Sequence, residues 1–479
     1  MATDNNRFQA IISHCKEYGF IFQSSEIYDG LSAVYDYGQW GSELKKNIRD
    51  YWWKSMTQLN ENIVGIDAAI FMHPTTWKAS GHVDNFSDPM IDNKDSKKRY
   101  RVDHLIEAKA DELESAGNAD AAKALLDEMD RLLADNEYDG LKKLIEGNKI
   151  KCAVSGTANW TDVRQFNLMF STQLGSVTEE ASEIYLRPET AQGIFVNFLN
   201  VQKTGRMKIP FGIAQIGKAF RNEIVARQFI FRMREFEQME MQFFIRPGTQ
   251  KEWYEHWKQK RMEWHQSLGI PAEKYRFHDH VKLAHYADAA CDIEYEFPIG
   301  FKEVEGIHSR TDFDLKNHQA FSKKKMQYFD SELNQNYIPY VIETSIGLDR
   351  MFLLIISQAY TLEDLSTAEK KDDRVVLKLP PKLAPVKLAI LPLLKKDGLP
   401  DIARQIMDDC KPHFRCFYEE KDAIGKRYRR MDAIGTPFCV TVDHQTKEDN
   451  TVTIRYRDSM KQERIPIANV CELVQKQIL

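Results

Sequence analysis

The 479-residue sequence has little of what marks an exported or membrane protein. Its seven cysteines are scattered and form no C-x-x-C pair, which argues against a disulfide framework and against a zinc knuckle. No stretch approaches about twenty uninterrupted apolar residues, so we expect no membrane span. The first residues lack a basic and then apolar leader, so we expect no export signal and a cytoplasmic protein.

The sequence also lacks a strong charge of one sign. A net charge of −5 excludes a uniformly basic coat for nucleic acid, although it leaves room for local basic patches. No G-x-x-x-x-G-K-S/T segment is present, which excludes the common phosphate-binding loop. The apolar and charged fractions are ordinary for a globular enzyme, and a chain of this length should hold two or three domains.

A strand-like stretch between Phe220 and Phe244 is the most informative part of the chain. Its second half alternates with period two, so a strand over 232–242 would place two arginines, an aromatic ring and a carboxylate on one face. Such a face is costly in a core and suits a ligand with phosphates, a base and an ammonium group. The alternative is a strand with one charged face in water, as in many antiparallel sheets. The residues of that face are Arg232, Arg234, Phe236, Gln238, Glu240 and Gln242.

Three segments, taken in order, resemble a known family. FRNE at 220–223, then a loop and RMREF at 232–236, resembles motif 2 of the class II aminoacyl-tRNA synthetases. ETSIGLDRMFLLIISQ at 343–358 resembles the Gly-Leu-x-Arg motif and apolar helix of the same family. With RPETAQG at 187–193, the combination is similar to glycyl-tRNA synthetases of the homodimeric kind, and the resemblance covers the whole chain.

The resemblance implies an α+β fold with three parts. Residues 1–375 should form a class II catalytic domain, an antiparallel β-sheet flanked by helices, with a helical insertion at about 100–150. Residues 376–385, where PPKLAP interrupts regular structure, should be a linker. Residues 386–479 alternate strand and helix patterns, which predicts an α/β anticodon-binding domain with a largely parallel core. In the family, a helix matching Leu44–Met56 packs across a homodimer axis, and its strand would span 64–74.

Two segments are candidate contacts to tRNA. Residues 105–148 lack proline and repeat apolar residues three or four apart, which predicts a helical hairpin. We expect that hairpin to face solvent, with a contact to the tRNA acceptor arm as the alternative. The helix within GKRYRRMDAIGTPF is basic, and it either contacts the tRNA backbone or is a solvated charged face. Its basic residues are Lys426, Arg427, Arg429 and Arg430.

The resemblance assigns one set of residues to ATP, with Arg221 and Arg350 as the catalytic residues. Arg221 would hold the α-phosphate, Arg350 the far phosphates, and Phe236 would stack on adenine. An arginine at the start of an apolar helix needs an anion, and a structural pair with a carboxylate is the alternative to a triphosphate. Glu303 would touch ATP through Mg²⁺, which takes oxygen ligands. The full ATP set is Arg221, Asn222, Glu223, Phe231, Arg232, Met233, Arg234, Glu235, Phe236, Glu303, Val304, Gly347, Leu348, Asp349 and Arg350.

The resemblance assigns a second set to glycine. A pocket gains nothing from a side chain that is absent, so it can select glycine only by excluding larger side chains. Carboxylates that crowd the α-carbon would hold the ammonium group and leave no room for a methyl group. Glu189 would be one of them, although a carboxylate favoured by a helix N-terminus is the alternative. The full glycine set is Arg101, Glu189, Phe236, Glu237, Gln238, Met239, Glu240, Glu343, Thr344, Ser345, Ile346 and Gly347.

The implied function is that of a glycine–tRNA ligase. ATP and glycine would give glycyl-adenylate and pyrophosphate, and the glycyl group would then pass to the 3′ end of tRNA(Gly), mainly through positioning and charge neutralisation. The nearest alternative is a class II synthetase for proline or serine, and RPETAQG with the Glu-x-Ser before Gly347 favours glycine. A non-catalytic module of the same fold would have lost its motif arginines, and Arg221 and Arg350 are present. The HIGH-like and KMSKS-like segments of class I synthetases are absent.

Overall fold

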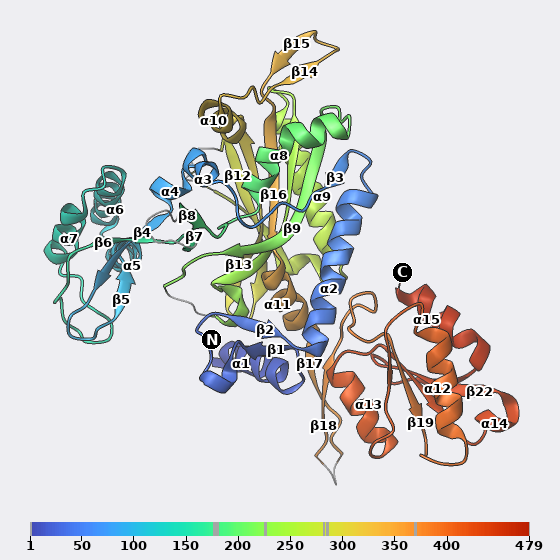
Figure 1. Cartoon of the computed structure of the whole chain (residues 1–479). Helices are drawn as coiled ribbons and strands as arrows, with labels where there is room; N and C mark the ends of the chain where they lie inside the picture. The colour runs from blue at the N-terminus through green and yellow to red at the C-terminus, as the bar shows by residue number, and fades with distance from the viewer. Residues whose placement is uncertain are drawn as a thin grey trace. The chain divides into compact units, whose positions relative to one another are not determined.

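The computed structural model describes residues 2–175, 182–224, 228–280, 283, 287–367 and 371–478 (Figure 1). The chain divides into two compact units. The first unit comprises Met1–Ile70, Glu189–Ala219 and Glu223–Leu479, and the second comprises Phe71–Pro188 and Phe220–Asn222. The second unit is therefore inserted into the sequence of the first.

A seven-stranded sheet forms the centre of the first unit, in the order β11-β12-β13-β16-β10-β9-β3. From β11 to β10 neighbouring strands run antiparallel, and β3 runs parallel to β9. The alternation in EFEQMEMQFF produces the inner strand β10, because residues two apart share a face. The strands are β3 Ile63–Gly65, β9 Phe211–Phe220, β10 Glu235–Ile245, β11 Tyr275–Asp279, β12 Ala289–Phe297, β13 Gly300–Thr311 and β16 Tyr340–Gly347.

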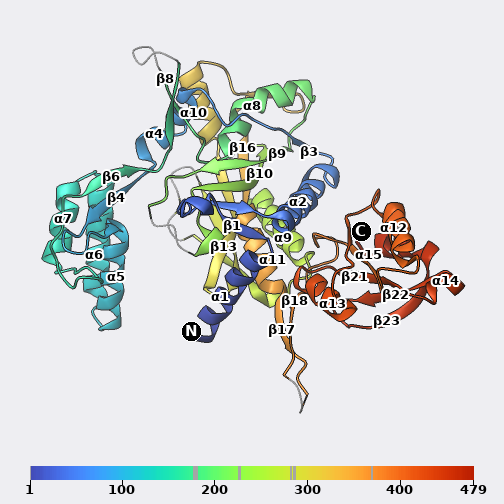
Figure 2. The ribbon, with the colours of Figure 1, turned by 60° about the horizontal axis from the view of Figure 1, so that its bottom comes forward.

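The two faces of this sheet are covered differently (Figures 1 and 2). On one face, Met239, Met241 and Ile346 join the main apolar core, against which α2, α9 and α11 pack. On the other face, Phe244 belongs to a smaller core with α8 and α10. Next to that smaller core the second face carries polar side chains, so it is the face that can receive a polar ligand. The helices are α2 Gln39–Trp53, α8 Ala191–Thr204, α9 Gln250–Gln266, α10 Phe313–Ser322 and α11 Leu348–Ala359.

The strand expected over 232–242 begins later than its sequence suggested. Phe229–Phe231 form a short 3-10 helix, and β10 starts only at Glu235. The backbone N–H of Arg234 donates to the Ala33 carbonyl, outside the central sheet. The arginines of this segment therefore precede the strand and are not on its face. The remaining elements before β3 are α1 Ala2–Glu17, β1 Ile21–Gln23, the 3-10 turn Glu26–Tyr28 and β2 Tyr35–Tyr37.

The two elements of the predicted dimer motif also have other bounds. The expected helix over Leu44–Met56 is α2 followed by a π-helical segment, Lys54–Gln58. The expected strand over 64–74 is reduced to the three residues of β3, and Pro74 instead begins helix α3. Proline suits that position because the first N–H of a helix has no partner within the helix.

The second unit contains the expected helical insertion, with three helices instead of a hairpin of two. Its helices bury apolar residues three or four apart, including Ile106, Met129 and Leu141, against Trp160. A small sheet in the order β5-β4-β6 contributes Ile91 to the same core. The elements are α3 Pro74–Ala79, α4 His82–Asn85, β4 Ser87–Asp92, β5 Arg99–Arg101, α5 Val102–Ser115, α6 Ala119–Ala134, α7 Tyr138–Gly147, β6 Arg164–Asn167, β7 Ser171–Leu174 and β8 Ser182–Tyr185.

The C-terminal part of the first unit is a five-stranded sheet with helices (Figure 2). Its order is β20-β19-β21-β22-β23, parallel over the first three strands and antiparallel over the rest. The sheet is therefore mixed and not largely parallel, because β22 and β23 add an antiparallel edge. The elements are β14 Tyr328–Asp330 and β15 Gln335–Tyr337 before this part, then β17 Tyr360–Asp364, β18 Asp373–Leu377, β19 Leu388–Pro392, α12 Leu399–Cys410, β20 Cys416–Tyr418, α13 Ile424–Ala433, β21 Phe438–Val442, α14 Thr446–Asp449, β22 Thr451–Tyr456, β23 Gln462–Pro466 and α15 Val470–Ile478.

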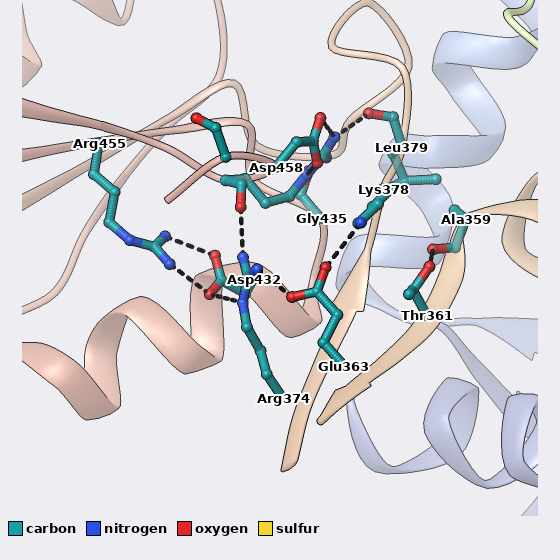
Figure 3. A network of polar contacts seen from close by, with 12 residues as sticks. Ala359, Thr361, Glu363, Arg374, Lys378, Leu379, Asp432, Gly435, Arg455 and Asp458 are labelled. Carbon is teal, nitrogen blue, oxygen red and sulfur yellow. Dashed lines mark hydrogen bonds and ion pairs between the residues drawn. The ribbon is translucent and has the colours of Figure 1, made fainter. Parts of the chain in front are cut away.

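Residues 376–385 are not an exposed connector. The first two belong to β18, which pairs with β17, and Leu379 and Leu383 are fully buried. Figure 3 shows Arg374 of β18 donating to the Asp432 carboxylate of α13, which also accepts from Arg455. This buried carboxylate between two guanidinium groups ties the connecting strand to the C-terminal sheet.

Candidate active site

The polar face of β10 and β16 is set by the register of the two strands. Glu240 lies directly opposite Ser345, and Gln242 lies opposite Glu343. Directly opposed residues of an antiparallel pair point to the same face. The prediction that Glu240 and Gln242 share one face is therefore confirmed, and the strand pairing adds Glu343 and Ser345 to that face.

One amide joins the two carboxylates of this face. Gln242 Nε2 donates to Glu240 Oε1 at 3.1 Å and to Glu343 Oε2 at 2.7 Å. The Thr190 hydroxyl, just before α8, donates to the second oxygen of Glu240. Glu240 is 2% exposed and Glu343 4% exposed, so both carboxyl groups are buried. Burial, together with the negative charges of Glu343 and Glu189, raises the pKa of Glu240 well above its usual range.

Glu343 has the opposite electrostatic surroundings. Arg310 Nη1 lies 3.0 Å from Glu343 Oε2, and His308 Nδ1 lies 2.7 Å from its other oxygen. Arg310 also forms a two-pronged pair with Asp314 of α10, at 2.8 and 3.0 Å. Burial alone would raise the pKa of Glu343, but Arg310, His308 and Gln242 outweigh it and lower that pKa. The pKa values of two neighbouring carboxyl groups are thus shifted in opposite directions, upward for Glu240 and downward for Glu343.

Glu189 enters the same cluster through Gln192. Gln192 Nε2 donates to Glu189 Oε1 at 3.0 Å and to Asp314 Oδ1 at 3.0 Å. Glu189 is close enough to contribute to the raised pKa of Glu240. We name the cluster of Glu189, Glu240 and Glu343 the acidic pocket. The Arg310 guanidinium is shared between Glu343 and the neighbouring Asp314. An arrangement of this kind is built to accept a further cation, such as an ammonium group.

Several residues assigned to glycine have side chains on the opposite face of the sheet. The expected contact of these side chains with glycine is therefore wrong. Met239 lies opposite Ile346 in the register, both are fully buried, and both belong to the apolar core. Thr344 pairs with Met241 and points the same way. Glu237 lies 3.2 Å from Lys45 Nζ, in a contact with α2. Only the backbone atoms of these assigned residues are available to the acidic pocket.

The residues assigned to ATP are also divided between the site and the core. The Asp349 carboxylate accepts from Lys45 Nζ at 2.7 Å, from the Glu237 N–H at 2.7 Å and from the Tyr37 hydroxyl. The Asp349 carboxylate is thus occupied by Lys45, Tyr37 and the Glu237 N–H, so the expected contact of this side chain with ATP is wrong. The same applies to three buried apolar residues of the set, which belong to the main core: Met233, Val304 and Leu348.

Arg350 has a carboxylate partner in this structure. Its Nη1 lies 3.0 Å from Glu303 Oε2, its Nε donates to the Phe231 carbonyl at 3.3 Å, and its guanidinium lies 4.4 Å from the centre of the Phe231 ring. The structural pair that sequence alone offered as the alternative is therefore present. Glu303 is about half exposed, with a side-chain exposure of 47%, so this pair faces solvent and can open.

The other residues assigned to ATP are partly exposed. Arg234 Nε donates to the Glu223 carbonyl at 3.1 Å, and Arg232 Nη1 lies 3.9 Å from the Glu223 carboxylate. Glu235 pairs with Lys218 at 2.6 Å. Phe236 is half-buried. Gly347 lies beside Arg350, because a Cβ atom added to Gly347 would come within 3.4 Å of the Arg350 side chain. The first unit thus brings these residues together at one end of β10 and β16.

Three assigned residues belong to the second unit. Arg221 Nε donates to the Pro188 carbonyl at 3.1 Å. The Asn222 N–H donates to the Leu168 carbonyl at 2.8 Å. Arg101 pairs with Asp103 and, at 3.2 Å, with Asp88.

The four basic residues of α13 differ in exposure. Arg427 is 1% exposed and donates to three backbone carbonyls, at Pro392, Glu419 and Leu393. It cannot meet a phosphate backbone, which corrects its expected contact with tRNA. Arg429 pairs with Asp372 at 2.9 Å and Arg430 with Asp422 at 2.9 Å, whereas Lys426 is exposed.

Sequence reasoning placed Gln242 on the expected ligand face but missed the other residues that organise the acidic pocket, namely Thr190, Gln192, His308, Arg310 and Asp314. Arg310 lies at an irregularity in the pairing of β13 with β16, between Ser309 and Thr311. A bulge re-aims a side chain, so simple alternation could not have placed it. Asp314 follows one helical turn later, and the i, i+4 spacing of Arg310 and Asp314 was the available signal.

Among residues 2–478, apart from the gaps given above, no group of three or more His, Cys, Asp or Glu side chains is arranged to hold a metal ion. Over the same described part of the chain, no helix has the length and apolar character needed to cross a membrane.

Comparison with protein families matches three models along the chain. Residues 170–359 match the class II tRNA synthetase core domain (G, H, P, S and T). Residues 88–125 and 116–168 match insertion domain 1 of glycyl-tRNA synthetase, and residues 387–477 match an anticodon binding domain.

Curated relatives match over almost the full length. A glycine–tRNA ligase of Chlorobaculum tepidum is 54% identical over 98% of this chain and 99% of its own. Glycine–tRNA ligases of Treponema denticola and Macrococcus caseolyticus are 51% and 50% identical, over 98% of this chain in both cases and over 97% and 98% of their own. With the core, insertion and anticodon-binding domains all matched, the chain belongs to the glycyl-tRNA synthetase family.

Proposed function

We propose that the chain joins glycine to tRNA(Gly) in two steps. The carboxylate of glycine attacks the α-phosphate of ATP, which gives glycyl-adenylate and releases pyrophosphate. The terminal adenosine of the tRNA then takes the glycyl group and AMP leaves. The family supports this reaction, and the acidic pocket is the observation on this chain that carries the choice of glycine.

The acidic pocket would bind glycine by its ammonium group. Glu240, Glu343 and Glu189 are charged or chargeable acceptors, and a hydrogen bond to a charged group is worth about 1.5–3 kcal/mol. Thr190 and Gln242 hold the carboxyl groups in place from two sides. With acceptors arranged on several sides of the amine, the α-carbon has no room for a methyl group, and larger amino acids are excluded by size.

The same site would hold ATP next to glycine. Arg350 would exchange the Glu303 carboxylate for phosphate oxygens, while Arg232 and Arg234 offer further positive charge and Phe236 an aromatic face for adenine. The carboxylate of Glu303, once released, is an oxygen ligand suited to Mg²⁺, which when bound would neutralise phosphate charge. Arg221 would contact the α-phosphate and Arg101 the glycine end. Glu223 would meet the adenine amine.

The remaining proposals concern assembly and tRNA. We propose a catalytic domain over 1–375 and an anticodon-binding domain over 386–479, in which Lys426, Arg429 and Arg430 contact tRNA. We also propose a homodimer. Ile27, Tyr28 and Leu31 support it, because they expose large apolar side chains shortly before α2. The scattered free cysteines suit a cytoplasmic location.

The test of the proposed function is amino-acid-dependent exchange between ATP and pyrophosphate, measured with each of the twenty amino acids and without tRNA. Exchange with glycine alone is expected. Exchange with proline or serine in place of glycine would contradict the proposed role of the acidic pocket. Absence of exchange with every amino acid, in a folded protein that binds RNA, would contradict the catalytic proposal itself.

A further inference from the structure

Glu240 and Glu343 are too close together to be ionised independently. Both accept from the same atom, Gln242 Nε2, at 3.1 and 2.7 Å, and burial together with the negative charge of Glu343 raises the pKa of Glu240. Buried carboxyl pairs of this kind lose their protons in two separated steps.

The surroundings decide which of the two carries the proton. Glu343 is held ionised by Arg310 at 3.0 Å and by His308 at 2.7 Å. Among the described residues Glu240 forms no ion pair: its carboxyl group accepts from the Thr190 hydroxyl and the Gln242 amide, and Glu189 adds a further negative charge.

Among the described residues of α10, α8 and β10, the side chains next to the acidic pocket add no cation that pairs with Glu240. α10 contributes Asp314, whose two oxygens are both occupied by Arg310. α8 contributes Gln192, a neutral amide. On β10 itself the neighbours on the same face are the neutral Gln238 and Gln242. Arg310 is therefore shared between Asp314 and Glu343, and Glu240 does not receive it.

We infer that Glu240 carries a proton in the empty acidic pocket and that the ammonium group of glycine displaces it, so that one proton passes to the solvent when glycine binds. Glycine enters as the zwitterion. The O–H bond of Glu240 breaks, its carboxylate accepts an N–H of the ammonium group, and the proton leaves to buffer, so charge and atoms balance. This inference rests on the proposed glycine pocket and goes beyond it, because it assigns Glu240 a change of protonation.

The replacement of the Glu240 proton by the ammonium group has a consequence for which small molecules the acidic pocket binds. A molecule of the same size without a positive charge, such as glycolate, has nothing to replace the proton on Glu240. It should therefore bind without proton release. The acidic pocket would then recognise the charge of the amine as well as its size.

The experiment is calorimetric titration of the intact protein with glycine in several buffers that differ in their heat of ionisation, at one pH. The slope of observed heat against buffer heat counts the protons exchanged. At a pH below the pKa of Glu240 in the empty pocket, we expect release of about one proton per glycine in the wild type, and glycine affinity that rises about tenfold per pH unit. No proton exchange and a pH-independent affinity between about pH 5 and about pH 8 would overturn the inference.

Two variants separate this inference from the proposed function. Glu240→Gln should bind glycine more weakly and release no proton, whereas Glu189→Gln should also bind more weakly but still release the proton. Proton release that persists in Glu240→Gln would overturn the assignment to Glu240. If both variants bind glycine as tightly as the wild type, the proposed pocket itself is wrong. If either variant binds too weakly for calorimetry, the pH dependence of glycine affinity in the wild type still decides between release and no release.

Discussion

Replacing Arg310 with glutamine should weaken the binding of glycine and leave that of ATP unchanged. The guanidinium is 4% exposed and donates to Glu343 at 3.0 Å and twice to Asp314, at 2.8 and 3.0 Å. Without this cation, burial raises the pKa of Glu343, and the carboxyl group takes up a proton. The ammonium group of glycine then loses one charged partner worth about 1.5–3 kcal/mol, which corresponds to a rise of about 10- to 150-fold in KM for glycine.

The assay is ATP–pyrophosphate exchange, with KM measured separately for glycine and for ATP. Arg261→Gln is the matched control, because Arg261 is 2% exposed and its Nε lies 2.6 Å from Glu305, which is on β13 but on its opposite face. Each variant breaks a buried ion pair, so each should lose about 3–5 kcal/mol of stability. A glycine KM that changes less than about twofold in folded Arg310→Gln, or that rises equally in the control, would refute this reasoning.

Three further predictions concern stability and tRNA. Asp432→Asn removes the buried carboxylate that Arg374 and Arg455 share and leaves Arg374 with Glu363 alone, so it should destabilise the protein by about 3–5 kcal/mol; an unchanged midpoint of denaturant unfolding would contradict this. Lys426→Ala should weaken tRNA binding without loss of stability, and Arg427→Ala should do the reverse, measured by tRNA titration and thermal unfolding. Burial and neighbouring carboxylates raise the pKa of Glu240 above its usual 4.5. As pH rises from 4.5 toward that raised pKa, the unfolded chain loses this proton before the folded protein does, so the free energy of unfolding falls. Glu240→Gln lacks this ionisable group. Without glycine, its melting temperature minus that of the wild type should therefore increase as pH rises above 4.5. A difference that stays constant with pH would contradict this prediction.

Period-two alternation correctly predicted that Glu240 and Gln242 share a face, but it also included Arg232 and Arg234, which precede the strand. Glu240, Glu343 and Ser345 share that face because β10 and β16 are regular strands in register. The same alternation explains why some residues assigned to glycine do not contact the acidic pocket. In a contiguous set such as 236–240, every second side chain points to the opposite face of the sheet. Glu237 and Met239 are such cases, one in contact with Lys45 and the other in the core.

Other parts of the site could not be predicted from local sequence. Arg310 depends on a bulge, and its role depends on Glu343 from a different strand. Arg427 is one of several basic residues in α13, and only the tertiary structure shows that it is buried against backbone carbonyls. The proline-containing segment 376–385 was expected to be a linker, but its leucines are buried, because they complete the core between the two sheets of the first unit.

The most direct test of the central claim compares two glutamates of the same strand. Glu240 lies in the acidic pocket, and Glu237 contacts Lys45 on the opposite face. Glycine-dependent ATP–pyrophosphate exchange should fall strongly in Glu240→Ala, through a KM for glycine at least about tenfold higher, while Glu237→Ala keeps the wild-type KM for glycine. A folded Glu240→Ala protein that activates glycine as well as the wild type would contradict the account.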